Sequence, residues 1–197
     1  MTNYIFQPSA SFGIGDSPFT TWENSFTDEE LDKIIEYCSG LPSEPALLDQ
    51  GKKDDDYRRS DVAWLQHNNE TSWIFDRIGF IARQLNGQFY RFDLYGFCEH
   101  MQFTIYDESN EGCYDWHTDS GGANFTPRKL SLVLQLTDPE EYEGGELQIL
   151  ASKNVESVTK QRGLVAAFPS YVLHRVTPVT KGNRKTLVVW VGGPQFR

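Results

Sequence analysis

Hydrophobic residues recur at every second position along several segments in the second half of the chain, and this period limits the folds open to it. Between residues 129 and 137 the alternation is carried by Leu130, Leu132, Leu134 and Leu136. Successive side chains of a strand point to opposite faces, so the period predicts strands with one face turned towards a core. A similar alternation covers 96–106, and shorter strands are expected at 146–150, 164–168, 173–177 and 185–191. Short strands separated by turns containing Gly, Pro and Asp predict a β-sandwich or jelly roll.

The first half of the chain carries two helical patterns instead. Thr27 and Glu30 form a capping box in front of an apolar stripe made of Leu31, Ile34, Ile35 and Cys38. A second helix is expected at about 70–85, ended by Asn86 and Gly87. Neither helix carries a group of chemically active side chains, so we expect both to support one face of a sheet. The prediction is a single, mainly β domain over 1–197, with a helical support region at 1–95 and a β core at 96–192.

The composition favours a packed protein with an acidic surface. The 197 residues include 13 Phe, 9 Tyr and 5 Trp, which argues against disorder. A net charge of -10 disfavours general binding of nucleic-acid phosphates and suits a basic protein or peptide partner, although solubility alone accounts for such a charge in many proteins. Three widely spaced cysteines, and no signal-peptide or membrane-span pattern, predict a cytoplasmic protein with free thiols and no membrane partner.

Three residues in the β half have the side chains of a metal site. His117 and Asp119 are two positions apart, so on an extended segment both point to one face, about 7 Å apart along the backbone. His174 follows in a different expected strand, which a jelly roll can bring beside the first. Two imidazoles and one carboxylate are the ligand set of mononuclear non-haem Fe(II) centres that keep open coordination positions.

Arg184 is a candidate partner for an anion. Alternation along the last strand places it on one face with Thr186, Val188 and Trp190. If that face looks inward, the guanidinium needs a buried anion, which a dicarboxylate cosubstrate would supply. The alternative is an exposed position at the strand edge. Gln102, Thr104 and Tyr106 share a strand face in the same way, and they line either a pocket or a solvated sheet surface.

With Gly144-Gly145-Glu146-Leu147 and Pro169-Ser170 between them, these positions closely resemble the 2-oxoglutarate- and Fe(II)-dependent oxygenases, in particular the prolyl 4-hydroxylase-like branch. The resemblance covers about 96–192 and implies a double-stranded β-helix, a form of jelly roll. It implies that His117, Asp119 and His174 bind Fe(II) as the catalytic group.

The resemblance also assigns the cosubstrate and substrate contacts. Arg184 would pair with the distal carboxylate of 2-oxoglutarate, and the other candidate cosubstrate contacts are Tyr106, Gln135, Leu147, Val188 and Trp190. Gln135 stands where some relatives have a tyrosine, and Val188 where some have a threonine. The candidate substrate contacts are Tyr114, Gln102 and Arg59. Arg59 belongs to the charged run 52–59, which predicts a solvated loop or, alternatively, a flap over the site.

The activity implied by the resemblance is hydroxylation of a prolyl residue in a protein or peptide, with O2 consumed and succinate and CO2 as coproducts. Ascorbate would be an accessory stimulant. Hydroxylation of a free amino acid or other small molecule is the alternative within the same class. A non-catalytic metal-binding jelly roll is the alternative of another class, and intact Arg184 and Tyr106 count against it, because a structural metal site needs no anion partner.

Overall fold

The computed structural model describes residues 18–48, 54–120, 128–151 and 153–194, and in these ranges two antiparallel sheets face each other. The larger sheet has the order β1 (Thr20–Trp22), β12 (Val165–Pro169), β8 (Arg128–Gln135), β14 (Val179–Gly192), β6 (Met101–Asp107), β4 (Asp61–Leu65) and β2 (Glu44–Pro45). Two short strands, β5 (Gly96–Phe97) and β9 (Tyr142–Gly144), also pair with β14. The smaller sheet has the order β11 (Asn154–Ser157), β10 (Leu147–Ala151), β13 (His174–Val176), β7 (Cys113–His117) and β3 (Arg58–Arg59).

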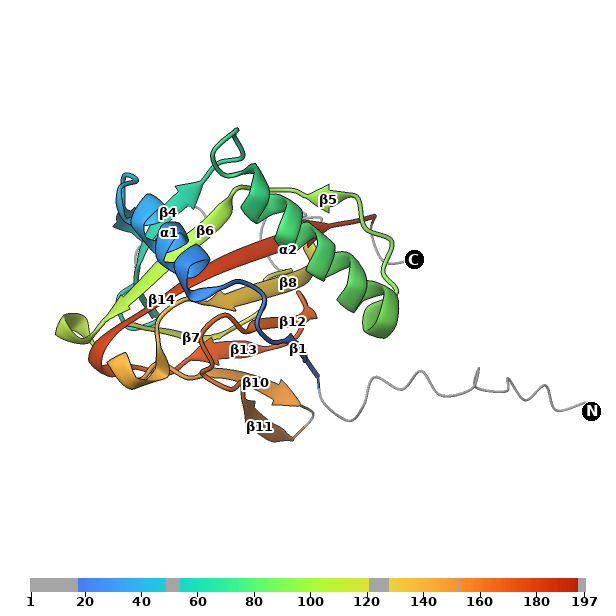
Figure 1. Cartoon of the computed structure of the whole chain (residues 1–197). Coiled ribbons are helices and arrows are strands. Elements are labelled where there is room, and N and C mark those ends of the chain that lie inside the picture. The colour runs from blue at the N-terminus through green and yellow to red at the C-terminus, as the bar shows by residue number, and fades with distance from the viewer. Residues whose placement is uncertain (1–17, 49–53, 121–127, 152, 195–197) are drawn as a thin grey trace, which may run out of the picture.

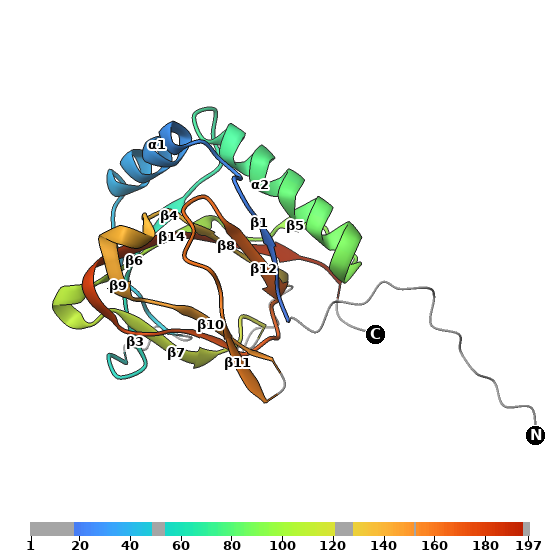
Figure 2. The same cartoon turned by 60° about the horizontal axis from the view of Figure 1, so that its bottom comes forward.

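Two helices, α1 (Asp28–Ser39) and α2 (Ser72–Leu85), cover the outer face of the larger sheet, as Figures 1 and 2 show. Their apolar faces pack on alternate residues of three central strands, a core that includes Leu31, Ile78, Phe103, Leu132, Leu187 and Val189. Burial of each such side chain contributes about 1.5–3 kcal/mol to folding. The predictions of a mainly β fold and of helical support on one sheet face are confirmed. No helix in the described ranges is long and apolar enough to cross a membrane.

The start of α1 forms as the sequence predicts. The Thr27 hydroxyl accepts a hydrogen bond from the Glu30 backbone N–H at 3.3 Å, and the Glu30 carboxylate accepts one from the Thr27 N–H at 3.0 Å. These two bonds satisfy backbone donors that have no partner within the helix. Arg77 of α2 forms an ion pair with Glu30 at 3.2 Å, so the cap also ties the two helices together.

Helix α2 ends at Leu85 with Asn86 as its C-cap, as expected. The chain continues as a π-helical turn, Asn86–Tyr90, and leaves helical geometry at Arg91, where φ is 55°. The Asn86 side chain bonds to the backbone of Phe92 through both its oxygen and its nitrogen, at 2.9 Å each. Tyr90 donates its hydroxyl to Ala167 of β12 at 2.6 Å. Anchorage to the sheet therefore accompanies a π-helical turn beyond the end of α2, and the sequence pattern did not predict this turn.

Two further segments differ from the sequence-based predictions. The strand expected over 96–106 is divided into β5 and β6, with residues 98–100 between them, because each piece pairs with a different part of β14. The region expected to be only helical support also supplies β1–β4. Of the charged run 52–59, residues 52–53 lie outside the described residues, 54–57 include a turn, and Arg58–Arg59 form β3.

The division of the larger sheet into two faces positions the functional residues. In the register of β14, Arg184 lies opposite Tyr106, Thr186 opposite Thr104, and Val188 opposite Gln102. On the other side of β14, Val188 lies opposite Val133 and Trp190 opposite Ser131. Leu187 and Val189 of β14 face the helices. Arg184, Thr186, Val188 and Trp190 alternate with them, so these residues and their partners on the neighbouring strands face the smaller sheet.

A turn glycine should be essential for this arrangement. Gly144 has a φ of 72°, and a Cβ added there would lie 2.0 Å from the carbonyl oxygen of Pro178. We expect Gly144→Ala to lower the free energy of unfolding by about 2 kcal/mol or more, because the left-handed conformation and the clash both cost energy. Gly87→Ala is the matched control: nothing lies within 4 Å of its added Cβ, and a gain of about 0.5 kcal/mol is expected. Urea unfolding of both variants measures the difference, and equal midpoints would contradict it.

Candidate metal centre

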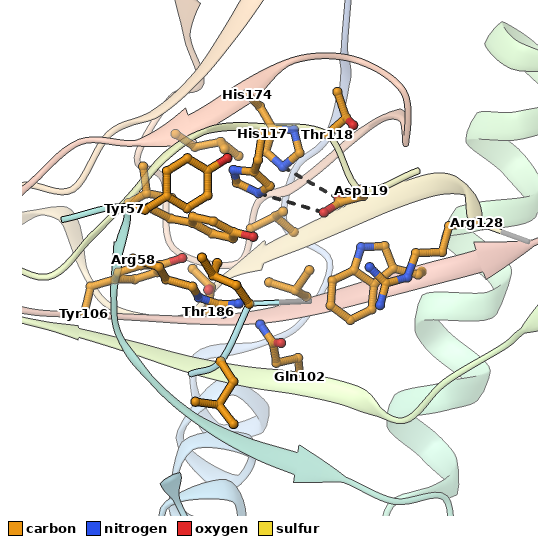
Figure 3. Close-up of a pocket in the computed structure, with 18 of the residues that line it drawn as sticks. Tyr57, Arg58, Gln102, Tyr106, His117, Thr118, Asp119, Arg128, His174 and Thr186 are labelled. Carbon is orange, nitrogen blue, oxygen red and sulfur yellow. Dashed lines mark ion pairs between the residues drawn. The ribbon is translucent and has the colours of Figure 1, made fainter. Parts of the chain in front are cut away.

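Strand pairing between β7 and β13 brings two histidines together. His174 lies directly opposite His117, and the centroids of the two imidazole rings are 4.2 Å apart. Asp119 follows His117 closely, and its backbone N–H donates to the Ser170 carbonyl at 2.8 Å. Its carboxylate oxygens lie 3.9 Å from Nε2 of His117 and 3.6 Å from Nε2 of His174, the pairs joined by dashed lines in Figure 3. One ligand atom from each residue therefore lies within 4.8 Å of the other two.

Backbone carbonyls orient both imidazoles. Nδ1 of His117 lies 2.7 Å from the Asp115 carbonyl oxygen, and Nδ1 of His174 lies 2.9 Å from that of Val172. A carbonyl oxygen only accepts, so each Nδ1 carries the hydrogen and each Nε2 presents its lone pair towards Asp119. This is the tautomer that a metal needs from both residues.

Electrostatics keep the group ready for a cation. Burial, together with the nearby His174, lowers the pKa of His117 to about 3, so its imidazole is neutral at physiological pH. Burial raises the pKa of Asp119, but His174, His117 and a hydrogen bond from Ser131 lower it further than burial raises it. Two imidazoles and one ionised carboxylate fit a divalent metal and leave coordination positions open.

Ser131 supports Asp119 from the larger sheet, and the sequence reasoning did not identify it. Its hydroxyl donates to Asp119 Oδ2 at 2.6 Å and lies 3.0 Å from the hydroxyl of Ser170. Both serines are buried. A signal existed in the sequence, because Ser131 shares a strand face with Val133 and Gln135, opposite the apolar face that carries the leucines.

A cavity of about 620 Å³ opens beside the three ligands. It is lined by seven other residues that the sequence had suggested, namely Gln102, Tyr106, Tyr114, Leu147, Arg184, Val188 and Trp190. The ring of Tyr114 stacks on His117 with centroids 3.5 Å apart, which restrains the imidazole plane. The cavity thus joins the candidate metal ligands to the candidate cosubstrate residues.

The buried guanidinium of Arg184 lies at one end of the cavity. Arg184 is 3 % exposed, and no carboxylate of the described residues forms an ion pair with it. The neighbouring hydroxyl oxygen of Thr186 is buried without a hydrogen-bond partner. Burial raises the pKa of Tyr106, which keeps its hydroxyl protonated as a donor. The Arg184 guanidinium, the unpartnered Thr186 hydroxyl and the protonated Tyr106 hydroxyl fit a ligand carboxylate.

Two suggested contacts lie outside this cavity. The Gln135 amide donates to the Thr137 carbonyl and to the Tyr142 hydroxyl, in a small adjoining space behind Arg184. Arg59 donates to the Glu111 and Asp55 carbonyls on the outside of β3. Its neighbour Arg58 lines the cavity instead, because adjacent strand residues face opposite sides.

Residues 101–192 match the model of the 2OG-Fe(II) oxygenase superfamily. This segment, just under half of the chain, carries all three candidate ligands and resembles the superfamily. The cofactors of the superfamily are Fe(II), 2-oxoglutarate and O2, and the group formed by His117, Asp119 and His174 fits the metal.

Sequence relatives of the chain include PKHD-type hydroxylases. One from Gloeothece citriformis (strain PCC 7424) is 44% identical over 80 residues, which are 40% of this chain and 36% of the relative. One from Teredinibacter turnerae (strain ATCC 39867 / T7901) is 40% identical over 88 residues, 42% of this chain and 38% of the relative. The chain therefore spans less than two fifths of the length of these two relatives.

Solved prolyl hydroxylases share the fold over most of the chain. A Pseudomonas putida prolyl-4-hydroxylase aligns with a TM-score of 0.72 and 18% identity, over 90% of this chain and 94% of that one. A prolyl hydroxylase from Trichoplax adhaerens, in complex with a hypoxia inducible factor peptide, aligns with a TM-score of 0.74 and 16% identity, over 89% and 83%. These likenesses confirm the predicted jelly-roll fold with supporting helices.

Loss of the Ser131 hydroxyl should weaken metal binding. Ser131→Ala removes the hydrogen bond that orients Asp119, and we expect about a 10- to 100-fold loss of affinity for Fe(II) or Co(II). Calorimetric titration under anaerobic conditions measures the change. Ser39→Ala, at the exposed end of α1, is the control and should bind as wild type does. Equal affinities of the two variants would show that the hydrogen bond does not support the metal site.

Proposed function

We propose that this protein is a 2-oxoglutarate-dependent dioxygenase that hydroxylates a prolyl residue in a protein or peptide and releases succinate and CO2. The observation that carries the proposal is the coexistence, in one cavity, of a two-histidine, one-carboxylate group and an unpaired buried guanidinium. A structural metal site has no use for the second feature. A dicarboxylate cosubstrate uses both.

Each residue has a defined task under this proposal. His117, Asp119 and His174 hold Fe(II), which when bound supplies the chemistry that couples O2 reduction to cosubstrate decarboxylation and substrate oxidation. Arg184 binds the distal carboxylate of 2-oxoglutarate, and the hydroxyls of Thr186 and Tyr106 donate to it.

The remaining walls exclude water and fix orientation. Leu147 and Val188 give the cavity apolar surface beside Arg184, and Trp190 forms a third wall. A dry cavity strengthens the attraction between Arg184 and its carboxylate, and it protects reactive species from solvent. Val133 also lines the cavity, on the same sheet face.

The choice of a prolyl substrate is supported by the relatives. Solved prolyl hydroxylases share the fold, and one of them was determined with a peptide in place. The small-molecule alternative uses the same metal and cosubstrate residues, so the substrate must be distinguished by experiment.

The direct test measures succinate formation by the purified protein with Fe(II), 2-oxoglutarate and O2. Proline-containing peptides and free proline are compared as stimulants, and mass spectrometry looks for the gain of one oxygen on a peptide proline. Turnover stimulated by the peptides alone is the expected result. Stimulation by free proline alone would favour the small-molecule reading, and absence of succinate under all conditions would contradict the enzyme.

Arg184→Gln tests the cosubstrate site within this experiment. Loss of the charged partner should raise the KM for 2-oxoglutarate about 10- to 150-fold, the effect of losing a hydrogen bond to a charged group. Arg83→Gln, on the exposed side of α2, is the matched control and should leave this KM unchanged. An unchanged KM in Arg184→Gln would place the distal carboxylate elsewhere.

A further inference from the structure

A second buried guanidinium faces the cavity, at Arg58 of β3. Arg58 is 8 % exposed, lies opposite Tyr114 in the strand register, and belongs to the cavity lining. Its Nε donates to the Ser60 hydroxyl at 3.0 Å, and its Cζ lies 4.4 Å from the centroid of the Tyr114 ring. The side chain is therefore held in place by a hydrogen bond and a cation–π contact.

Neither contact neutralises the charge of Arg58. No carboxylate of the described residues forms an ion pair with it. A third arginine of the cavity lining, Arg128, differs in this respect, because it is paired with Glu99. Figure 3 shows Arg58 on the side of Tyr57 and Tyr106, and Arg128 at the other side of the metal-ligand group.

The cosubstrate does not supply the missing anion. A bound divalent metal and Asp119 together leave one positive charge, and Arg184 adds a second. The two carboxylates of 2-oxoglutarate balance these two charges. Among the described residues that line the cavity, Arg58 then remains as an uncompensated charge, and a buried charge without a counter-ion is unfavourable.

Arg58 also lies close to the candidate reaction centre. The Tyr114 ring that it contacts stacks on the metal-ligand candidate His117, with centroids 3.5 Å apart. An anion held by Arg58 therefore belongs to the residue that is modified or to its immediate neighbour.

We propose that Arg58 is a specificity-determining residue that binds a carboxylate of the substrate, next to the position that is hydroxylated. This inference rests on the proposed function and narrows its substrate class to prolyl substrates with an adjacent acidic group. The acidic outer surface still suits a basic partner at a distance, whereas the inner cavity selects for an acid. The carboxylate comes from an Asp or Glu side chain of a peptide, or from the α-carboxylate of a free amino acid.

The test measures binding, so that it is independent of turnover. Protein loaded with Mn(II) and 2-oxoglutarate without O2 is titrated with acetyl-Pro-Asp-amide and with its neutral isostere acetyl-Pro-Asn-amide. Free proline and prolinamide form the second pair, which separates an α-carboxylate from a side-chain carboxylate. We expect the acid of one pair to bind about tenfold or more tightly than its neutral partner.

Variants assign this preference to Arg58. Arg58→Gln should bring the affinity ratio of the selected pair close to one, Arg58→Lys should retain part of the ratio, and Arg83→Gln should retain all of it. Mn(II) affinity and circular dichroism establish that each variant is folded.

Three results would overturn the inference: equal binding within both pairs by the wild type, no binding of any of the four probes, or an unchanged ratio in Arg58→Gln. An unchanged ratio with weaker 2-oxoglutarate binding would assign Arg58 to the cosubstrate. Because succinate formation is not measured here, failure of this inference is distinct from failure of the proposed activity.

Discussion

The antiparallel pairing of β7 with β13 places His117 opposite His174, and the candidate site depends on this one register. A slip of either strand by one residue would turn its own imidazole to the other face of the sheet, away from the second imidazole. The register is held on both sides, since β10 pairs with β13 and β3 pairs with β7. Asp119 follows β7, and its backbone N–H donates to the carbonyl of Ser170, which follows β12 of the larger sheet. This hydrogen bond helps to hold the Asp119 carboxylate beside the two imidazoles.

The larger sheet contributes through the division of its two faces. One face of β14 is apolar and packs on the helices, and the other carries Arg184, Thr186 and Trp190 into the cavity. The helices bury the first face and so fix which face is left for chemistry. Stability and function therefore use alternate residues of the same strands, which is why the helices themselves need no active groups.

The buried charges of the cavity determine which ligands it can accommodate. Asp119 is buried, and so are Arg58 and Arg184, so these groups meet their partners in a region of low dielectric where unpaired charge is costly. A divalent metal would compensate the negative charge of Asp119, and the two carboxylates of the cosubstrate would compensate the metal and Arg184. The positive charge of Arg58 remains after these two ligands bind, and this is why we propose that the substrate carries a carboxylate.

The sequence predicted those features that depend on local pattern. The capping box of Thr27 and Glu30, the two faces of β14 and the grouping of two histidines with Asp119 all follow from spacing, and the resemblance to a family added the cosubstrate. Features set by tertiary contacts were missed. The π-helical turn after α2 depends on Tyr90 reaching Ala167, and the support of Asp119 by Ser131 depends on two strands meeting across the cavity. Arg59, a candidate substrate contact, lies outside the cavity and its neighbour Arg58 lines it, because the charged run contains a two-residue strand that the sequence pattern did not predict.

The most direct measurement is the absorption spectrum of the anaerobic protein with Fe(II) and 2-oxoglutarate. If His117, Asp119 and His174 hold the iron beside the Arg184 end of one cavity, a visible charge-transfer band should appear only when both are present, and His174→Ala should abolish it. Protein that binds Fe(II) fully but develops no band on addition of 2-oxoglutarate would contradict a shared metal and cosubstrate site.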